Sequence, residues 1–112
     1  MTRRAAILAS SLALVACVSF GEDLRRGVLH HESERWNDAM AVWLQIEADA
    51  PAQTRAERGQ YHAYRGLTHL RLGARADARH HLVLAHQFWA ALPPDLRRRV
   101  EEAERELGGP SR

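Results

Sequence analysis

One pattern of residues occurs twice in this 112-residue chain, and the constant spacing between its two copies limits the folds that the chain can adopt. Residues of similar type recur at this repeat spacing, which pairs Arg26 with Arg65, Gly27 with Gly66, His30 with His69, Ala39 with Ala78 and Trp43 with Leu82. A repeat of this length is typical of two helices joined by a turn, a unit that buries its apolar face only against a neighbouring unit. The sequence therefore predicts two helical hairpins in an all-α fold.

Both copies resemble the tetratricopeptide repeat (TPR), in which small, aromatic and large apolar residues stand at fixed positions along two antiparallel helices. The matching positions, which we expect to be structural, are Gly27, Trp36, Ala39 and Trp43 in the first copy and Gly66, Gly73, Ala78 and Leu82 in the second. The resemblance covers residues 22–91. It implies that the small residues let the helices approach closely, while Leu82 fills the space between the hairpins.

The repeat spacing, which is the distance along the chain from Arg26 to Arg65, is about five residues longer than the usual family period of about 34 residues. We place the extra residues in the connection over 48–59, where Asp49 and Pro51 predict the start of a helix. Turn signals and apolar spacing together predict five helices, over residues 22–33, 35–48, 51–72, 75–91 and 95–107.

The last predicted helix follows Pro93 and Pro94 and precedes Gly108, residues that are typical of helix boundaries. Its apolar residues form a single stripe, which consists of Leu96, Val100, Ala103 and Leu107. We therefore expect residues 92–107 to form a capping helix that closes the repeat array. Residues 108–112 are expected to form a flexible tail.

The first residues of the chain have the pattern of a secretory signal peptide. Arg3 and Arg4 precede an apolar run over residues 5–16, which is shorter than the roughly 20 apolar residues of a membrane span. The run ends in four residues that resemble the lipobox of bacterial lipoproteins, namely Leu14, Val15, Ala16 and Cys17. The resemblance implies that residues 1–16 are removed and that Cys17 carries acyl chains such as palmitate, which together give stable membrane attachment. Residues 17–21 would then form a short tether.

Two other interpretations of Cys17 stay open. In the first, it is an incidental residue of an ordinary secretory signal that is cut elsewhere. In the second, it is a structural or redox cysteine, although the only cysteine of a chain cannot form an internal disulfide.

The charge of the chain does not favour a nucleic-acid partner. The sequence has 16 basic and 14 acidic residues, but Arg3 and Arg4 belong to the predicted signal peptide. The remaining basic and acidic residues are equal in number, so the mature chain would lack the net positive field that nucleic-acid binding uses.

No group of residues predicts catalysis or a cofactor. The sequence has no nucleophile in a Gly-flanked turn and no Gly-rich phosphate loop, so we do not expect an enzyme. None of the 7 histidines stands three or four residues from another, the spacing typical of a metal site on one helix, and we predict no metal. Mixed pairs such as Asp77 with His80 keep a histidine-based periplasmic metal-binding protein as a less favoured alternative.

Peptide binding on a concave face lined by the first helix of each hairpin is the role that the resemblance to TPR proteins implies. The positions that would face such a groove are Arg25 and Val28 in the first copy and Gln60, Tyr64, Leu67 and Arg71 in the second. Arg25 and Arg71 would then bind acidic groups through paired hydrogen bonds. The alternative is that these residues form a solvated face.

The sequence as a whole predicts a small lipid-anchored adaptor that binds a protein or peptide in a bacterial cell envelope. We expect it on the outer membrane, facing the periplasm. Because about three repeats are normally needed for independent stability, we expect the array to dock onto another protein or a second copy of itself. A self-assembling structural lipoprotein is the main alternative.

Overall fold

The computed structural model describes residues 19–108, and within them the chain forms α-helices and two 3-10 helices with no strand. The elements in order are α2 (Phe20–Glu32), α3 (Trp36–Ile46), η1 (Glu47–Ala52), α4 (Arg55–Arg71), α5 (Arg75–His86), η2 (Trp89–Ala91) and α6 (Pro94–Glu106). The predicted all-α fold is confirmed. The lipobox, the predicted signal peptide and residues 109–112 lie outside the described residues.

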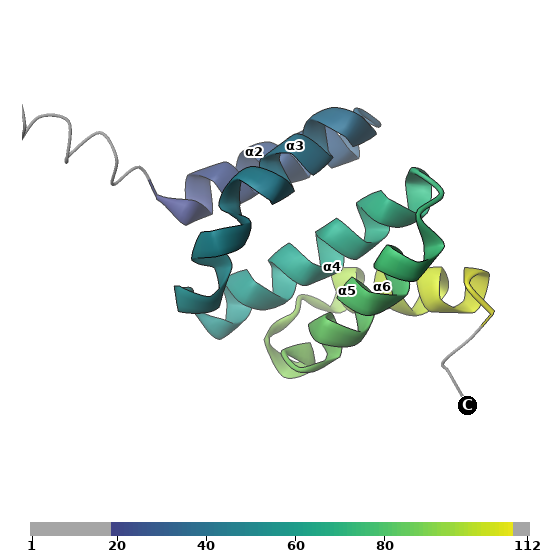
Figure 1. The fold of residues 1–112 in the computed structure, drawn as a ribbon. Helices are drawn as coiled ribbons and strands as arrows, with labels where there is room; N and C mark the ends of the chain where they lie inside the picture. The colour runs from purple at the N-terminus through teal and green to yellow at the C-terminus, as the bar shows by residue number, and fades with distance from the viewer. Residues whose placement is uncertain (1–18, 109–112) are drawn as a thin grey trace, which may run out of the picture.

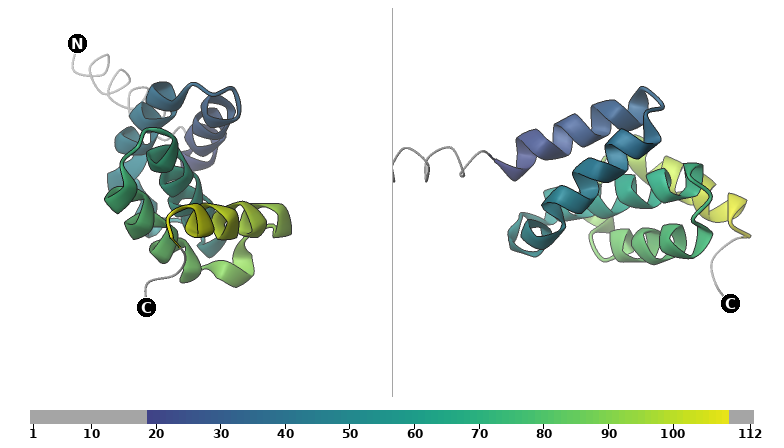
Figure 2. Two further views of the ribbon diagram at one scale, coloured as in Figure 1. Left: turned by 90° about the vertical axis from the view of Figure 1, so that its right-hand side faces the viewer. Right: turned by 45° about the horizontal axis from the view of Figure 1, so that its top comes forward.

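Two antiparallel hairpins and one further helix make up the structure. Helices α2 and α3 form the first hairpin, α4 and α5 form the second, and the two hairpins stack on each other (Figure 1). Helix α6 packs beside the second hairpin, where it contacts α4 and α5 (Figure 2). Helix α4 is the central element, because it contacts each of the other four α-helices.

The repeat spacing of the sequence is visible in the packing of the hairpins. A Cβ atom on Gly27 would lie 2.5 Å from the ring of Trp43, and a Cβ atom on Gly66 would lie 2.8 Å from the side chain of Leu82. The two contacts are equivalent, because the repeat spacing separates Gly27 from Gly66 and also separates Trp43 from Leu82. Each glycine therefore allows a large apolar side chain of the second helix to lie against the backbone of the first.

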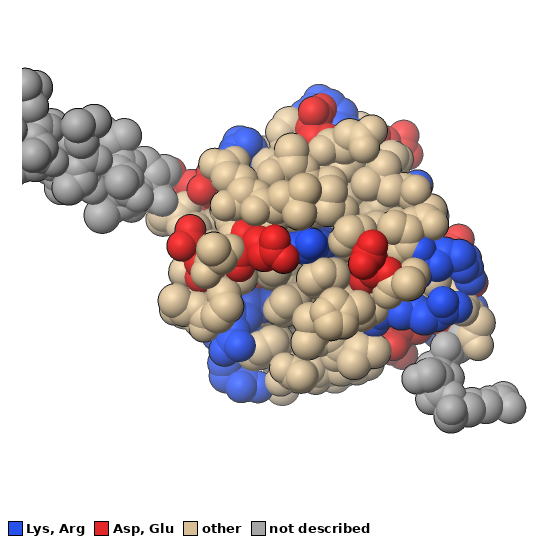
Figure 3. Space-filling model, viewed as in Figure 1, with Lys and Arg blue, Asp and Glu red and all other residues tan. Residues whose placement is uncertain are grey.

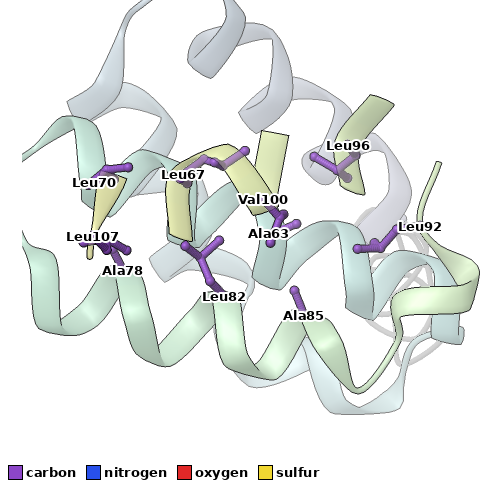
Figure 4. Close-up of a cluster of buried hydrophobic side chains, with 11 residues drawn as sticks. Ala63, Leu67, Leu70, Ala78, Leu82, Ala85, Leu92, Leu96, Val100 and Leu107 are labelled. Atoms are coloured by element: carbon purple, nitrogen blue, oxygen red, sulfur yellow. The ribbon is translucent and has the colours of Figure 1, made fainter. Parts of the chain in front are cut away.

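Helix α6 extends the same period. It begins at Pro94 and α4 begins at Arg55, so the repeat spacing also separates the starts of these two helices. The apolar stripe predicted for α6 is buried, and it packs with residues of α4 and α5 in one core cluster (Figure 4). The helix thus covers the second hairpin as the first helix of a third unit would, which agrees with the predicted capping role.

Most predicted helices differ from the observed ones by one to three residues at each end, but one connection differs in kind. The helix predicted over 51–72 begins at Arg55, because Thr54 and not Asp49 caps it. The Thr54 side chain accepts a hydrogen bond from the backbone N–H of Glu57 and donates one to its carboxylate. This N-cap leaves Pro51 in the 3-10 helix η1, which holds the extra residues of the longer period.

Two other boundaries also differ from the prediction. The helix predicted over 75–91 ends at His86, and η2 follows as a separate short turn. At the N-terminal end of the described residues, Ser19 caps α2. Phe20 and Gly21 therefore belong to this helix and not to the predicted tether over 17–21. Phe20 is buried, with its ring edge-on to Tyr61 of α4. The predicted tether is therefore shorter than expected.

Among residues 19–108, no helix is both long and apolar enough to span a membrane. Acidic and basic side chains lie in small separate groups on the face shown in Figure 3. The polar faces of the helices are therefore mixed in charge on this side.

We predict opposite effects of substitution at Glu34 and Gly73, two helix ends where the backbone adopts a positive φ. Glu34 has a φ of 60°, and Gly73, its equivalent in the second copy, has a φ of 80°. Because this conformation costs a residue with a side chain about 1 kcal/mol more than it costs glycine, Glu34→Gly should raise the free energy of unfolding. Gly73→Ala should lower it by a similar amount. Urea denaturation followed by circular dichroism measures both, and destabilisation by Glu34→Gly would contradict the prediction.

Candidate functional site

A groove of about 580 Å³ runs between the end of α2, the second half of α4 and α6. Its volume lies within the range of roughly 300–1,000 Å³ that is common for binding sites. The residues that line it are His31, Glu32, Glu34, Trp36, Leu67, Arg71, Arg99, Glu102, Ala103 and Glu106. Because α6 follows the same period as α4, the groove lies along three successive first helices of the array.

Arg99 of α6 contacts both α2 and α4, the other two helices that form most of the groove. From α6, it donates a hydrogen bond of 2.6 Å to the carboxylate of Glu32 at the end of α2. Its guanidinium also lies 5.5 Å from the centre of the Tyr64 ring on α4, a distance at which a cation is attracted to the ring face. Arg71 and Glu106 form a looser ion pair across the groove, at 3.8 Å.

A buried hydroxyl group supports the α2 end of the groove. Thr68 Oγ1 donates to the backbone carbonyl of Tyr64 at 2.7 Å and accepts a hydrogen bond from Trp43 Nε1 at 3.0 Å. The same oxygen lies 2.9 Å from His31 Nδ1. Since a hydroxyl has one proton to donate, all three contacts are satisfied only when His31 carries its proton on Nδ1. Nε2 of His31 is then a hydrogen-bond acceptor.

Burial keeps His31 neutral. The side chain is 3% exposed, and burial together with the nearby guanidinium of Arg99 lowers its pKa to about 4. The Thr68 hydrogen bonds require a proton on Nδ1, and the low pKa makes this the single proton of a neutral ring.

The groove contains only some of the residues predicted for it. Leu67 and Arg71 line the groove, and Leu67 also belongs to the core cluster shared by α4, α5 and α6. Tyr64 is half-buried beside the groove, where its ring faces Arg99. Gln60 is half-buried on α4 but is not part of the lining.

The two positions predicted on α2 lie elsewhere. Val28 packs against a separate core cluster, formed mainly by residues of α2 and α3. Arg25 lines a separate shallow hollow on α2, together with Glu22, Arg26, Leu29, His30 and Arg35. The structure therefore does not bring Arg25 and Arg71 together in one groove.

The residues predicted to be structural fall into three groups. Six of them are buried at the contacts between helices, namely Gly27, Ala39, Trp43, Gly66, Ala78 and Leu82. Gly73 lies in the turn between α4 and α5, where its positive φ ends the helix. Trp36 is only partly buried and lines the groove, with its ring 4.9 Å from that of His31.

Sequence reasoning missed the acidic half of the groove and its wall on α6. Glu32 and Glu34 come after the α2 positions that were predicted to line the groove. Glu102 and Glu106 lie on α6, for which only a capping role was predicted. The spacing between Arg55 and Pro94 is the signal that would have placed α6 in the groove.

A second cluster of polar groups lies between α4 and α5, where three histidine rings stack. His62 Nδ1 and His81 Nδ1 are 3.2 Å apart, and the ring of His69 stacks on His81 with centres 5.4 Å apart. Spacing along one helix could not reveal this cluster, because its members come from two helices. Burial, with nearby Arg58, lowers the pKa of His62 to about 4, and burial, with nearby Arg65, lowers that of His81 to about 3.

The histidine cluster does not form a metal site in the described part of the chain. No group of three or more His, Cys, Asp or Glu residues there is arranged to hold a metal ion. The small cavity beside His62 and His81 is also lined by the side chains of Arg58 and Arg65, whose charge would repel a cation. The cluster is therefore better described as neutral packing between two helices.

No protein-family model, curated protein or solved structure matches this chain. The features of the chain that bear on its function are its groove, its charges and its N-terminal sequence. Of these features, the groove is the one that is formed by the packing of the helices.

We predict that acid destabilises the fold through three histidines, of which His31 and His81 are buried and His62 is half-buried. The pKa values of His31, His62 and His81 are about 4, 4 and 3 in the folded chain, against an ordinary value of 6.5. The unfolded chain therefore binds more protons below pH 6.5, so the free energy of unfolding should fall as the pH is lowered from 6.5 toward 4. If all three groups titrate together, the slope would approach about 4 kcal/mol per pH unit.

Urea denaturation at several pH values tests this prediction. His81→Asn should reduce the slope by about one third, because one of the three groups no longer titrates. His80→Asn is the matched control, since His80 is the exposed neighbour of His81. A free energy of unfolding that stays constant between pH 7 and pH 5 would show that the histidines do not behave in this way.

Proposed function

We propose that the chain is a membrane-anchored, TPR-like adaptor lipoprotein that binds a protein partner in the groove between α2, α4 and α6. The observation that carries the proposal is the groove itself. Its walls come mainly from α2, α4 and α6, with Trp36 added from α3, and its lining is mainly charged, in contrast to the apolar clusters that hold the helices together. Such a surface suits recognition of another chain without catalysis.

The proposed membrane attachment is supported by the sequence around Cys17 and by the position of the first helix. Leu14, Val15 and Ala16 precede the cysteine as in bacterial lipoproteins. Helix α2 begins at Phe20, so the folded domain starts three residues after the proposed lipid. We place the protein in the bacterial cell envelope, on the outer membrane with its groove facing the periplasm.

Replacement of the proposed lipidated residue tests the anchor. Cys17→Ser removes the thiol that would accept the lipid, so the variant should leave the membrane fraction or accumulate with an uncleaved signal peptide. Wild type should partition into the membrane and carry the mass of the attached acyl chains. If Cys17→Ser is processed and sediments with membranes like wild type, the lipid assignment is wrong.

Site-specific cross-linking tests the adaptor role with a substitution that removes only one of the six charged side chains lining the groove. In the lipidated protein, Glu102→Cys would supply a single free thiol in the groove, to which a photoreactive group can be attached. Val83→Cys is the control, because Val83 is 58% exposed on α5 and does not line the groove. We expect an envelope protein to be captured from position 102 and not from position 83.

Other cross-linking results would point elsewhere. Equal capture from both positions would contradict binding through the groove. Capture of a second copy of this chain would instead support the self-assembling alternative. Absence of any adduct from position 102 in intact cells would contradict the adaptor role.

A further inference from the structure

The groove carries more negative than positive charge. Its lining contains four carboxylates, on Glu32, Glu34, Glu102 and Glu106, and two guanidiniums, on Arg71 and Arg99. Both guanidiniums already form ion pairs with carboxylates of the same groove. Arg99 pairs with Glu32, and Arg71 pairs with Glu106. Within residues 19–108, Glu34 and Glu102 form no ion pair, so they remain as acceptors for another molecule.

A buried side chain independently presents an acceptor to the groove. His31 is 3% exposed and lines the groove. Its Nδ1–H donates a hydrogen bond to Thr68 Oγ1, and the lone pair on Nε2 has no partner among the described residues. Every fully buried polar side-chain atom of those residues has a hydrogen-bond partner, so Nε2, which has none, is not fully buried. Because His31 lines the groove, Nε2 is open to solvent there.

We propose that the groove binds a cationic segment of the partner, through arginine or lysine side chains that donate hydrogen bonds to Glu34, Glu102 and Nε2 of His31. The proposal deepens the adaptor function and rests on it. Arginine and lysine are donors only, and the unpartnered groups of the groove are acceptors only. Charge-assisted hydrogen bonds of this kind are the stronger ones in proteins.

The two arginines of the groove do not change this preference. Arg99 is held between the Glu32 carboxylate and the Tyr64 ring, so an acidic ligand would have to displace both contacts. Arg71 is half-exposed, but an anion that approached it would also meet Glu106 and its neighbour Glu102. The same negative balance disfavours an anionic lipid headgroup as the occupant. This conclusion reverses the expectation that Arg71 would bind acidic groups.

A pair of synthetic peptides tests the proposal on the mature lipidated protein in a neutral detergent. Both peptides have capped ends and the same Ser-Gly spacing, and they differ only in carrying four arginines or four glutamates. Isothermal titration calorimetry should show binding of the arginine peptide alone. Its affinity should fall by at least about tenfold between roughly 50 and 300 mM salt, because the contacts are electrostatic. Preference for the glutamate peptide, or an equal affinity for both, would overturn the proposal.

Neighbouring carboxylates on α6 provide a matched pair of variants. Glu102→Gln removes one groove acceptor and should weaken binding of the arginine peptide about three- to tenfold. Glu101→Gln removes the same charge from an exposed position outside the groove lining, and it should leave the affinity nearly unchanged. Equal effects of the two variants would show that only the overall charge matters and would overturn the site.

The peptide and cross-linking experiments fail in different ways. Capture of a partner from position 102 without preference for the arginine peptide would leave the adaptor function standing and refute the cationic segment. Failure of both experiments would refute the adaptor function as well.

Discussion

The hydroxyl of Thr68 joins the two hairpins, and the arrangement of the groove depends on it. The group is fully buried and contacts His31 of α2, Trp43 of α3 and the backbone of its own helix. Without it, the buried N–H groups of the tryptophan and the histidine would lack acceptors, each at a cost of about 1–3 kcal/mol. The equivalent position in the first copy is Leu29, which is 65% exposed because no other hairpin of residues 19–108 packs on that side of α2.

Neutral histidines are a second condition of the structure. His31 at the groove and His62, His69 and His81 between α4 and α5 all lie where burial disfavours their charged form. The stacked rings of the second hairpin tolerate close approach only while they are uncharged. The packing of both hairpins therefore requires the same protonation state, although the two sets of histidines contact different partners.

The fold followed from the sequence largely because close packing leaves a strong signal. The small residues, among them the glycines at 27 and 66, predicted the close approach of the two helices of each hairpin, since few other residues fit there. Leu82, expected between the hairpins, instead packs inside the second hairpin against Gly66. The connection over 48–59 was less well predicted, because a proline and an aspartate suit a 3-10 turn as well as a helix start. Thr54 and Glu57, spaced as an N-cap and the third residue of a helix, carry the decisive signal for the start of α4.

The groove was harder to predict than the fold, for a physical reason. Periodicity places a residue on a helix face, but it does not say which other helices close that face. Arg25 and Arg71 were both expected to face one groove, yet only the second faces α6. The histidine pair was missed for the same reason, since His62 and His81 meet only through the packing of two helices.

The position of α2 has a consequence for how an anchored protein would find its partner. A span of three residues is at most about 10 Å, and a helix of 13 residues rises about 20 Å from Phe20 to the groove at its other end. With a lipid on Cys17, the groove would stay within about 30 Å of the bilayer surface. Confinement to so thin a layer raises the effective concentration of the groove toward any partner segment that is also tethered there. Even individually weak charge contacts would then suffice for lasting association at the membrane, whereas a soluble partner would gain nothing from it.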